Sequence, residues 1–300
     1  MSSRKRTKKI KGTKLLYTFK SDVLIKMLSK GYPHLLKRLV AALLGIPFGS
    51  IKHFKVINPE MPPLYVKGKL CRLDIIMEID GRYVNLEIQV KKDKHFSDRA
   101  MYYLAKMFVS SLDAGEHYSD LPKSIIICIV DFAVTGSKDG ASYYGFMELR
   151  RYELLSDKQM ICFFELPKLP RANNVDPANE RDLWFALFNA KTEEDLAVLE
   201  EKGGVIMKQA IEAYRSITAD EEFRYWNEMV EKARRDEAQA LYNAKIQGEK
   251  IGEKRSNKKW KNVVAEKEAA LAKKDAALVE KDAALVEKDA IIAELLAKMK

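Results

Sequence analysis

One dipeptide constrains the fold of this chain more than any other feature. Asp80-Gly81 stands between two runs of alternating apolar and polar residues in the stretch LCRLDIIMEIDGRYVNLEIQV. Asp-Gly in this setting predicts a two-residue β-hairpin turn in which both central residues have positive φ. The turn fixes the pairing of the two strands, with Ile79 expected to face Arg82.

This register gives the hairpin one apolar and one polar face. The apolar face is expected to carry Leu73, Ile75, Met77, Val84, Leu86 and Ile88. On the polar face, Asp74 is expected to lie opposite Glu87, and Arg72 opposite Gln89. Directly opposed residues have Cβ atoms roughly 4.5–5.5 Å apart. The sequence therefore predicts two carboxylates at close range.

Two like charges at that distance need compensation. A shared proton, a cation such as Arg72, or a bound divalent metal could provide it. Mg²⁺ prefers oxygen ligands and keeps several waters, so a phosphate oxygen could also bind; the metal would then favour phosphodiester hydrolysis. The alternative is purely structural, because the polar faces of antiparallel sheets commonly carry acidic residues.

The wider pattern predicts a mixed α/β fold with a helical C-terminal part. Strands are expected near 51–57, 70–79, 82–90, 124–130, 143–149 and 160–166, and helices over 22–30, 33–44, 97–112, 181–188, 193–200, 205–217 and 223–247. Gly248 and Gly252 are interpreted as a break before the last segment. Leu271, Leu278, Leu285 and Ile292 recur there at heptad spacing, although charged residues flank them. A long charged helix is expected, and homo-oligomerisation through it is a further option.

The charge distribution suggests contact with nucleic acid outside the core. Of the net charge of +10, residues 1–20 contribute +8 and residues 245–260 contribute +4. Such segments attract phosphate without sequence preference. The three cysteines lack zinc-ligand spacing. No apolar run is long enough for a membrane span and no secretory signal is recognisable, so a cytoplasmic protein is expected, with association with the nucleoid as an option.

The run RLDIIMEIDGRYVNLEIQV followed by FSDRAMYYLAKMF resembles the recombination-promoting nuclease and putative transposase family, a branch of the PD-(D/E)xK nucleases. The family pattern has an Asp on one strand, Glu-x-Gln on the next, and then a helix containing Arg. Asp74, Glu87, Gln89 and Arg99 occupy these positions. Upstream, FKSDVLIKMLS resembles the family's N-terminal helix, which makes Asp22 a further candidate.

The resemblance implies a PD-(D/E)xK, restriction-endonuclease-like fold: a central mixed sheet flanked by helices, with a helical C-terminal region and a long terminal helix. It also implies Mg²⁺-dependent endonuclease activity on DNA, linked to recombination or mobile elements. Asp74 and Glu87 would bind the metal. Gln89 stands where many relatives carry Lys, and a neutral amide cannot supply that positive charge.

The expected division of the chain is a basic disordered arm over 1–16, a nuclease-like domain over 17–170, a helical region over 171–247, and a linker with the heptad helix over 248–300. Two other functions remain open. The chain could be a catalytically inactive module of the same fold that binds DNA or protein, or a structural protein that oligomerises through its terminal helix.

Overall fold

The computed structural model describes residues 12–57, 65–66, 69–70, 75–112 and 115–298. The chain divides into two compact units, Met1–Ala233 and Arg234–Lys300. All strands of the described residues and the candidate site lie in the first unit, which has the mixed α/β architecture that the sequence predicts.

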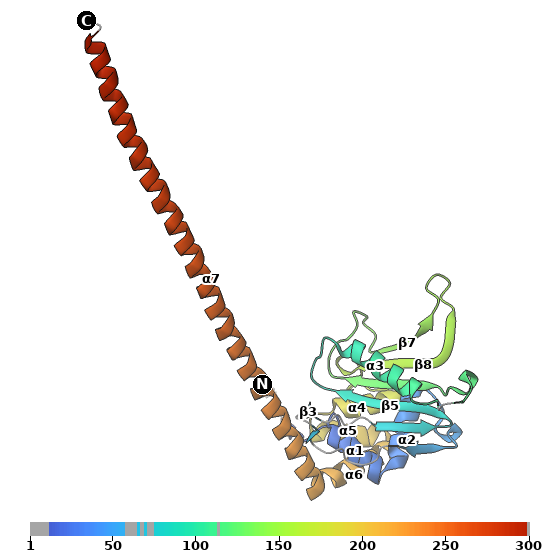
Figure 1. The fold of residues 1–300 in the computed structure, drawn as a ribbon. Helices are drawn as coiled ribbons and strands as arrows, with labels where there is room; N and C mark the ends of the chain where they lie inside the picture. Colours follow the sequence, from blue (N-terminus) through green and yellow to red (C-terminus); the bar gives the residue numbers. More distant parts are fainter. Residues whose placement is uncertain (1–11, 58–64, 67–68, 71–74, 113–114, 299–300) are drawn as a thin grey trace, which may run out of the picture. The chain divides into compact units, whose positions relative to one another are not determined.

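A six-stranded mixed sheet forms the centre of the first unit (Figure 1). In spatial order its strands are β1 (Phe54–Val56), β4 (Ile75–Ile79), β5 (Arg82–Gln89), β6 (Ser124–Val130), β8 (Leu154–Glu165) and β7 (Ala141–Met147). The β5–β6 and β6–β8 pairs are parallel and the other three are antiparallel. Strands β2 (Tyr65–Val66) and β3 (Lys69–Leu70) form a separate pair.

The β4–β5 hairpin has the predicted turn and register. Asp80 and Gly81 have φ values of 47° and 73°, and Ile79 pairs with Arg82. The Asp80 carboxylate accepts hydrogen bonds from the backbone N–H groups of His53, at 2.7 Å, and Lys52, at 3.0 Å. The His53 bond is the main cause that holds the pKa of Asp80 below its usual value. The turn is thereby joined to the segment that leads into β1.

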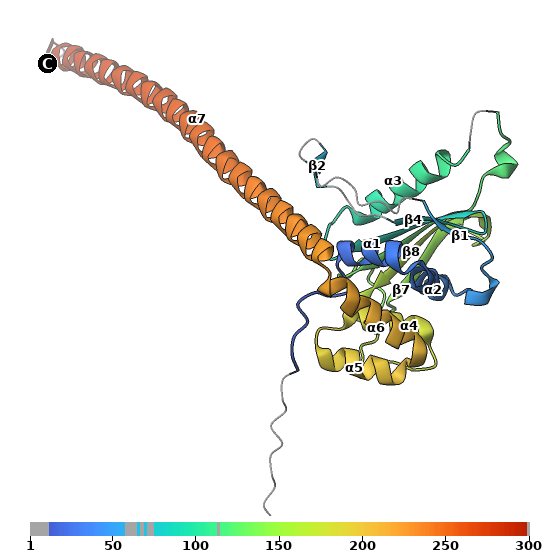
Figure 2. The same ribbon diagram turned by 90° about the horizontal axis from the view of Figure 1, so that it is seen from below.

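Helices cover both faces of the sheet (Figure 2). The helix α3 (Phe96–Val109) covers one face, where Phe96, Ala100 and Leu104 pack on apolar side chains of β6 and β8. The larger core fills the other face. It contains buried side chains of α1 (Asp22–Gly31), α2 (Pro33–Leu44), α4 (Glu180–Asn189), α5 (Glu193–Lys202) and α6 (Gly204–Ala219). Short 3₁₀ turns occur at Phe48–Ser50 (η1), Tyr118–Asp120 (η2) and Leu166–Lys168 (η3).

Local sequence signals account for several helix ends. Pro33 lies in the first turn of α2, and Gly45 closes that helix in the left-handed conformation at φ 67°. Thr192 caps α5 through a capping box with Asp195. The boundaries expected for the helices before α7 consequently agree with the structure to within a few residues.

The expected N-terminal arm extends only partly into the described residues. Residues 1–11 lie outside them, whereas Leu15 is buried and its N–H donates to the carbonyl of Lys191 at 2.9 Å. Lys14 forms a bridge with Thr192. The residues just before position 16 are therefore part of the packed unit.

The long helix α7 runs from Glu221 to Lys298. Its first turns belong to the first unit, where Phe223 is buried and meets the ring of Tyr17 at 4.8 Å. The break expected at Gly248 and Gly252 is wrong, because both glycines lie inside this helix. A glycine costs about 1 kcal/mol in a helix, which good helix-forming neighbours can offset. No helix within the described residues has an apolar stretch that could cross a bilayer.

Candidate active site

Strand β5 places Glu87 and Gln89 on the sheet face that α3 covers. Its alternation sends Val84 and Leu86 into the larger core on the opposite face. Glu87 is only 2% exposed although it is charged. A buried carboxylate requires charged or hydrogen-bonding partners, so the neighbours of Glu87 define the site.

Arg99 reaches Glu87 from α3. It lies one turn after Phe96 and next to Ala100, two side chains that anchor the helix on the sheet. The guanidinium carbon lies 4.7 Å from the centroid of the Phe96 ring, and the Arg99 side chain is 13% exposed. Packing on the ring fixes the direction of the guanidinium towards β5.

The Arg99 guanidinium joins three side chains. Its Nη2 donates to Oε1 of Glu87 at 2.9 Å and to Oε1 of Gln89 at 3.0 Å. Its Nη1 donates to Oδ2 of Asp93 at 2.9 Å. The amide of Gln89 also donates through Nε2 to the carbonyl of Lys91 at 2.8 Å. Three of the predicted site residues, Glu87, Gln89 and Arg99, are therefore in one hydrogen-bonded group.

Asp93 is a member of this group that the sequence analysis missed. Its Oδ1 accepts the backbone N–H of His95 at 2.9 Å, just before α3 begins, while its Oδ2 binds Arg99. An Asp a few residues before a predicted helix is a common local signal for such a turn. The signal predicts the turn, but not the second contact six residues later.

A second ion pair lies at the ends of β5 and β6. The backbone N–H of Asp131 donates to the carbonyl of Gln89 at 2.9 Å, and Lys20 Nζ donates to Oδ1 of Asp131 at 2.7 Å. Lys20 immediately precedes the Ser21 cap of α1. The sequence analysis missed both residues. The one signal available was the position of Asp131, an acidic residue directly after the predicted buried strand.

The structure does not test the roles predicted for Asp74 and Asp22. Asp74 lies outside the described residues, so its pairing with Glu87 stays a prediction. Asp22 is the first residue of α1, and its role also stays a prediction. Within the described part of the chain, no group of three or more His, Cys, Asp or Glu side chains is arranged to hold a metal ion.

The chemistry of the described group nevertheless suits a hard cation. The oxygens of Glu87 and Gln89 converge on one positively charged nitrogen, Arg99 Nη2. The set of Glu87, Asp93 and Arg99 contains two carboxylates and one guanidinium. Oxygen donors with surplus negative charge are the environment that Mg²⁺ prefers.

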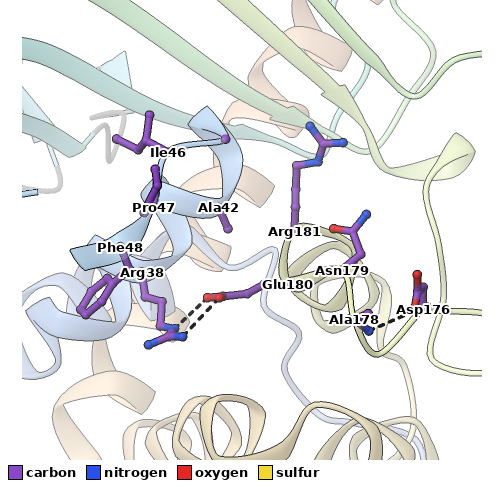
Figure 3. A pocket seen from close by; sticks show the side chains of 12 residues that line it. Arg38, Ala42, Ile46, Pro47, Phe48, Asp176, Ala178, Asn179, Glu180 and Arg181 are labelled. Atoms are coloured by element: carbon purple, nitrogen blue, oxygen red, sulfur yellow. Dashed lines mark hydrogen bonds and ion pairs between the residues drawn. The ribbon is translucent and has the colours of Figure 1, made fainter. Parts of the chain in front are cut away.

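A separate cavity of about 600 Å³ lies among the helices that cover the sheet face opposite α3 (Figure 3). Residues of α2, η1 and the start of α4 line it, and Arg38 binds Glu180 across it with contacts of 2.8 and 3.3 Å. Its lining does not include Glu87, Gln89 or Arg99. This cavity therefore belongs to the packing between helices and not to the acidic site.

A comparison with protein families decides the affiliation of the chain. The family described as PD-(D/E)XK nuclease family transposase matches residues 24–244. The chain belongs to this family. No curated protein and no solved structure gives a significant match. The six-stranded mixed sheet with flanking helices is consistent with the PD-(D/E)XK fold, and membership supports a nuclease-type hydrolase function.

The match spans the hairpin and helix of the candidate site. The β4–β5 hairpin, the helix α3 with Arg99, and Asp131 lie inside residues 24–244, whereas Lys20 and Asp22 lie just before them. It also includes α4 to α6 and the first part of α7. The helical C-terminal region is thus part of what the PD-(D/E)XK family shares, whereas the heptad segment lies beyond the match.

Proposed function

We propose that the chain is a metal-dependent DNA endonuclease whose active centre contains Asp74, Glu87 and Gln89. The observation that carries the proposal is the contact of Arg99 with Glu87 and Gln89, on a hairpin whose described register matches the predicted one. Membership in the PD-(D/E)XK nuclease family supports the reaction type.

Asp74 and Glu87 are the residues that would hold the divalent cation. When bound, such an ion supplies Lewis acidity at a phosphate oxygen and lowers the pKa of a bound water. Arg99 fixes one oxygen of Glu87 through a charge-assisted hydrogen bond of 2.9 Å. The carboxylate is thereby oriented before any substrate binds, which reduces the reorganisation needed during reaction.

Gln89 takes an orienting role in this proposal. Its Oε1 accepts from Arg99 and its Nε2 donates to the carbonyl of Lys91, so both ends of the amide are held. An amide nitrogen carries two hydrogens. We assign the second one to the attacking water or to a phosphate oxygen. The positive charge that Gln89 lacks is supplied by Arg99 at 3.0 Å.

DNA is the proposed substrate. Lys91, Lys92 and Lys94 are exposed on the loop that directly follows Gln89, where they can meet the phosphate backbone next to the site. The basic residues in the first twenty positions would add affinity through counterion release. A role in recombination or element mobility accords with the transposase description of the family.

Cutting of supercoiled plasmid tests the proposal directly. Purified protein should nick or linearise the plasmid with Mg²⁺ or Mn²⁺ and lose this activity with chelator. Asp74→Ala and Glu87→Ala should each reduce the rate by at least about 100-fold, since each would remove a proposed ligand. Equal activity in the chelated sample or in both variants would reject the metal-dependent reaction.

Glu78→Gln is the matched control. Glu78 lies on the same face of the same hairpin, pairs with Tyr83, and has a side chain that is one-third exposed. It also meets His53 at 3.8 Å, away from Arg99. This variant should retain cutting. If it fails as completely as Glu87→Ala, the loss reflects damage to the hairpin and the assignment of Glu87 is unsupported.

One observation favours a second candidate, a catalytically inactive module of the same fold. Arg99 already compensates the buried Glu87 charge, as it would in a site that binds no metal. Binding of DNA by the unaltered protein, without cutting under any tested divalent ion, would favour this candidate over the nuclease.

A further inference from the structure

The basic segment 245–261 lies wholly within the helix α7. The sequence predicts a linker over part of this segment, but the helix runs through it without a break (Figure 1). The segment belongs to the second unit of the chain, and every residue over 247–262 is exposed. Packing against a core therefore does not explain the pattern of its side chains.

Four lysines of this segment share one side of the helix. They follow one another at intervals of four, four and three residues, as Lys250, Lys254, Lys258 and Lys261. An α-helix turns by about 100° per residue, so the four side chains fall within an arc of about 80°. We call this set the lysine stripe. It is a continuous row of positive charge on a helix surface that faces solvent.

The acidic residues of the segment lie outside this arc. Glu253 and Glu249 are about 100° and about 140° from the middle of the lysine stripe. Glu249 instead contacts Lys245, one turn earlier, at 3.9 Å. Among the described residues, no lysine of the stripe has an ion-pair partner. The positive charge of the stripe is therefore not neutralised within the helix.

The lysine stripe is unfavourable for the helix on its own. Lys254 stands four residues from both Lys250 and Lys258, and like charges at this spacing repel each other. Opposite charges at the same spacing, such as Lys245 and Glu249, would instead support the helix. An external polyanion that binds along the stripe removes this repulsion and stabilises the helix at the same time.

We propose that the lysine stripe binds the phosphate backbone of duplex DNA. The helix rises about 16 Å between Lys250 and Lys261, and a duplex carries one negative charge per about 1.7 Å of its axis. Several phosphates thus lie within reach of the four ammonium groups. Such contacts position a protein on DNA without reading its sequence. The nuclease family supports DNA as the polyanion, although the stripe itself lies beyond the matched residues 24–244.

The opposite side of the helix argues against a membrane surface as the partner. A helix that lies on an anionic membrane needs a broad apolar face next to its basic one. Here the side away from the lysine stripe carries Glu249, Ser256 and Lys259, with Trp260 as its one large apolar side chain. The pattern therefore favours a polyanion that is bound through charge alone.

Binding of the full-length chain to a fluorescein-labelled, random-sequence DNA duplex tests this proposal. Anisotropy is measured over a range of salt concentrations, with chelator present so that metal-dependent cutting is absent. Lys250→Gln/Lys254→Gln/Lys258→Gln/Lys261→Gln should weaken binding by at least about 10-fold at about 0.1 M salt. The slope of log K against log salt should become shallower by about three to four, because each lost phosphate contact removes about 0.9. Glutamine is a good helix former, so the circular dichroism spectrum should stay the same.

Two control variants separate the lysine stripe from net charge and from helix damage. Lys267→Gln/Lys273→Gln/Lys274→Gln/Lys281→Gln removes the same charge farther along α7, where acidic residues are interleaved, and should bind DNA as the unaltered chain does. Replacement of the four stripe lysines by arginine keeps the charge and should also retain binding.

Three outcomes would overturn the proposal. They are an unaltered chain that does not bind the duplex, a stripe variant with unchanged affinity and salt slope, and equal weakening in the stripe and control variants. Vesicles that contain phosphatidylserine serve as a further probe, and a chain that binds them but not the duplex would assign the stripe to a membrane instead. None of these results depends on whether the chain cuts DNA.

Discussion

Arg99 Nη2 lies 2.9 Å from Oε1 of Glu87, and both side chains are nearly excluded from solvent. The same nitrogen also reaches Gln89, while the other end of the guanidinium holds Asp93. A planar group with several fixed N–H donors can make these contacts together. The stability of the fold and the rate of cutting should therefore depend on the planar shape of the Arg99 guanidinium as well as on its charge.

Arg99→Lys tests that dependence. Lysine keeps the charge but presents a single ammonium, which cannot reach Glu87, Gln89 and Asp93 in the same geometry. We expect about 1–3 kcal/mol lower stability in urea unfolding, and about 100-fold slower cutting of plasmid DNA. Arg215→Lys, at a half-exposed pair with Glu200, should change stability by less than about 1 kcal/mol. An Arg99→Lys variant as stable and as active as the unaltered chain would refute this role.

Gln89→Lys should be harmful even though lysine is the residue that many relatives carry at this place. Arg99 Nη2 lies 3.0 Å from Gln89 Oε1, so an ammonium there would face a guanidinium of the same charge. We expect about 1–2 kcal/mol lower stability, and a smaller loss for Gln89→Glu, which keeps an acceptor for Arg99. Thermal unfolding of both variants checks this order. Greater stability for Gln89→Lys than for Gln89→Glu would contradict it.

Divalent metal should stabilise the unaltered protein without any DNA present. A ligand that binds only the folded state adds about 2.7 kcal/mol at a concentration 100 times its Kd. The melting temperature should rise with Mg²⁺ or Mn²⁺, and this rise should be absent in Glu87→Gln. Glu78→Gln should keep the rise, because Glu78 lies apart from the Arg99 contacts. An equal shift in all three proteins would indicate metal binding elsewhere.

Glu165 should make stability depend on pH in the acid range. Burial opposes its charge, but hydrogen bonds from Lys168, Thr135 and the Val134 N–H outweigh burial and hold the pKa of Glu165 below its usual value. Its ionised form therefore favours folding above the unfolded pKa of about 4.5, and this contribution is lost as the pH falls through the lower folded pKa.

Glu165→Gln should remove that part of the pH dependence. At pH 7 the free energy of unfolding of the variant should be about 3 kcal/mol lower, because Lys168 would lose the carboxylate that it contacts. The difference from the unaltered protein should shrink between about pH 5 and pH 3 in denaturant titrations. Glu180→Gln is the control, because Glu180 and its partner Arg38 are about one-third exposed. This variant should lose less stability than Glu165→Gln. A pH-independent difference for Glu165→Gln would contradict the prediction.

The sequence by itself determined the hairpin that carries Glu87. An Asp-Gly turn and a period of two are local properties, and they specify pairing because a slip of one residue would expose the apolar face of β4 and β5. The same kind of local signal placed Arg99 near the start of a helix, and the family resemblance then named it as a candidate. The sequence could not decide whether Arg99 and Glu87 touch.

Only the tertiary structure decided which groups surround Glu87. Arg99 meets Glu87 because α3 packs on the sheet, and Lys20 meets Asp131 across 111 positions of the chain. Such contacts depend on how elements pack, which periodicity does not encode. Leu15 is also buried by tertiary packing, although the sequence predicts that it belongs to a basic disordered arm. The helix α7 continues past Gly248, because its neighbours favour helix and the free-energy cost of one glycine is small compared with the stabilisation from a long run of helical hydrogen bonds.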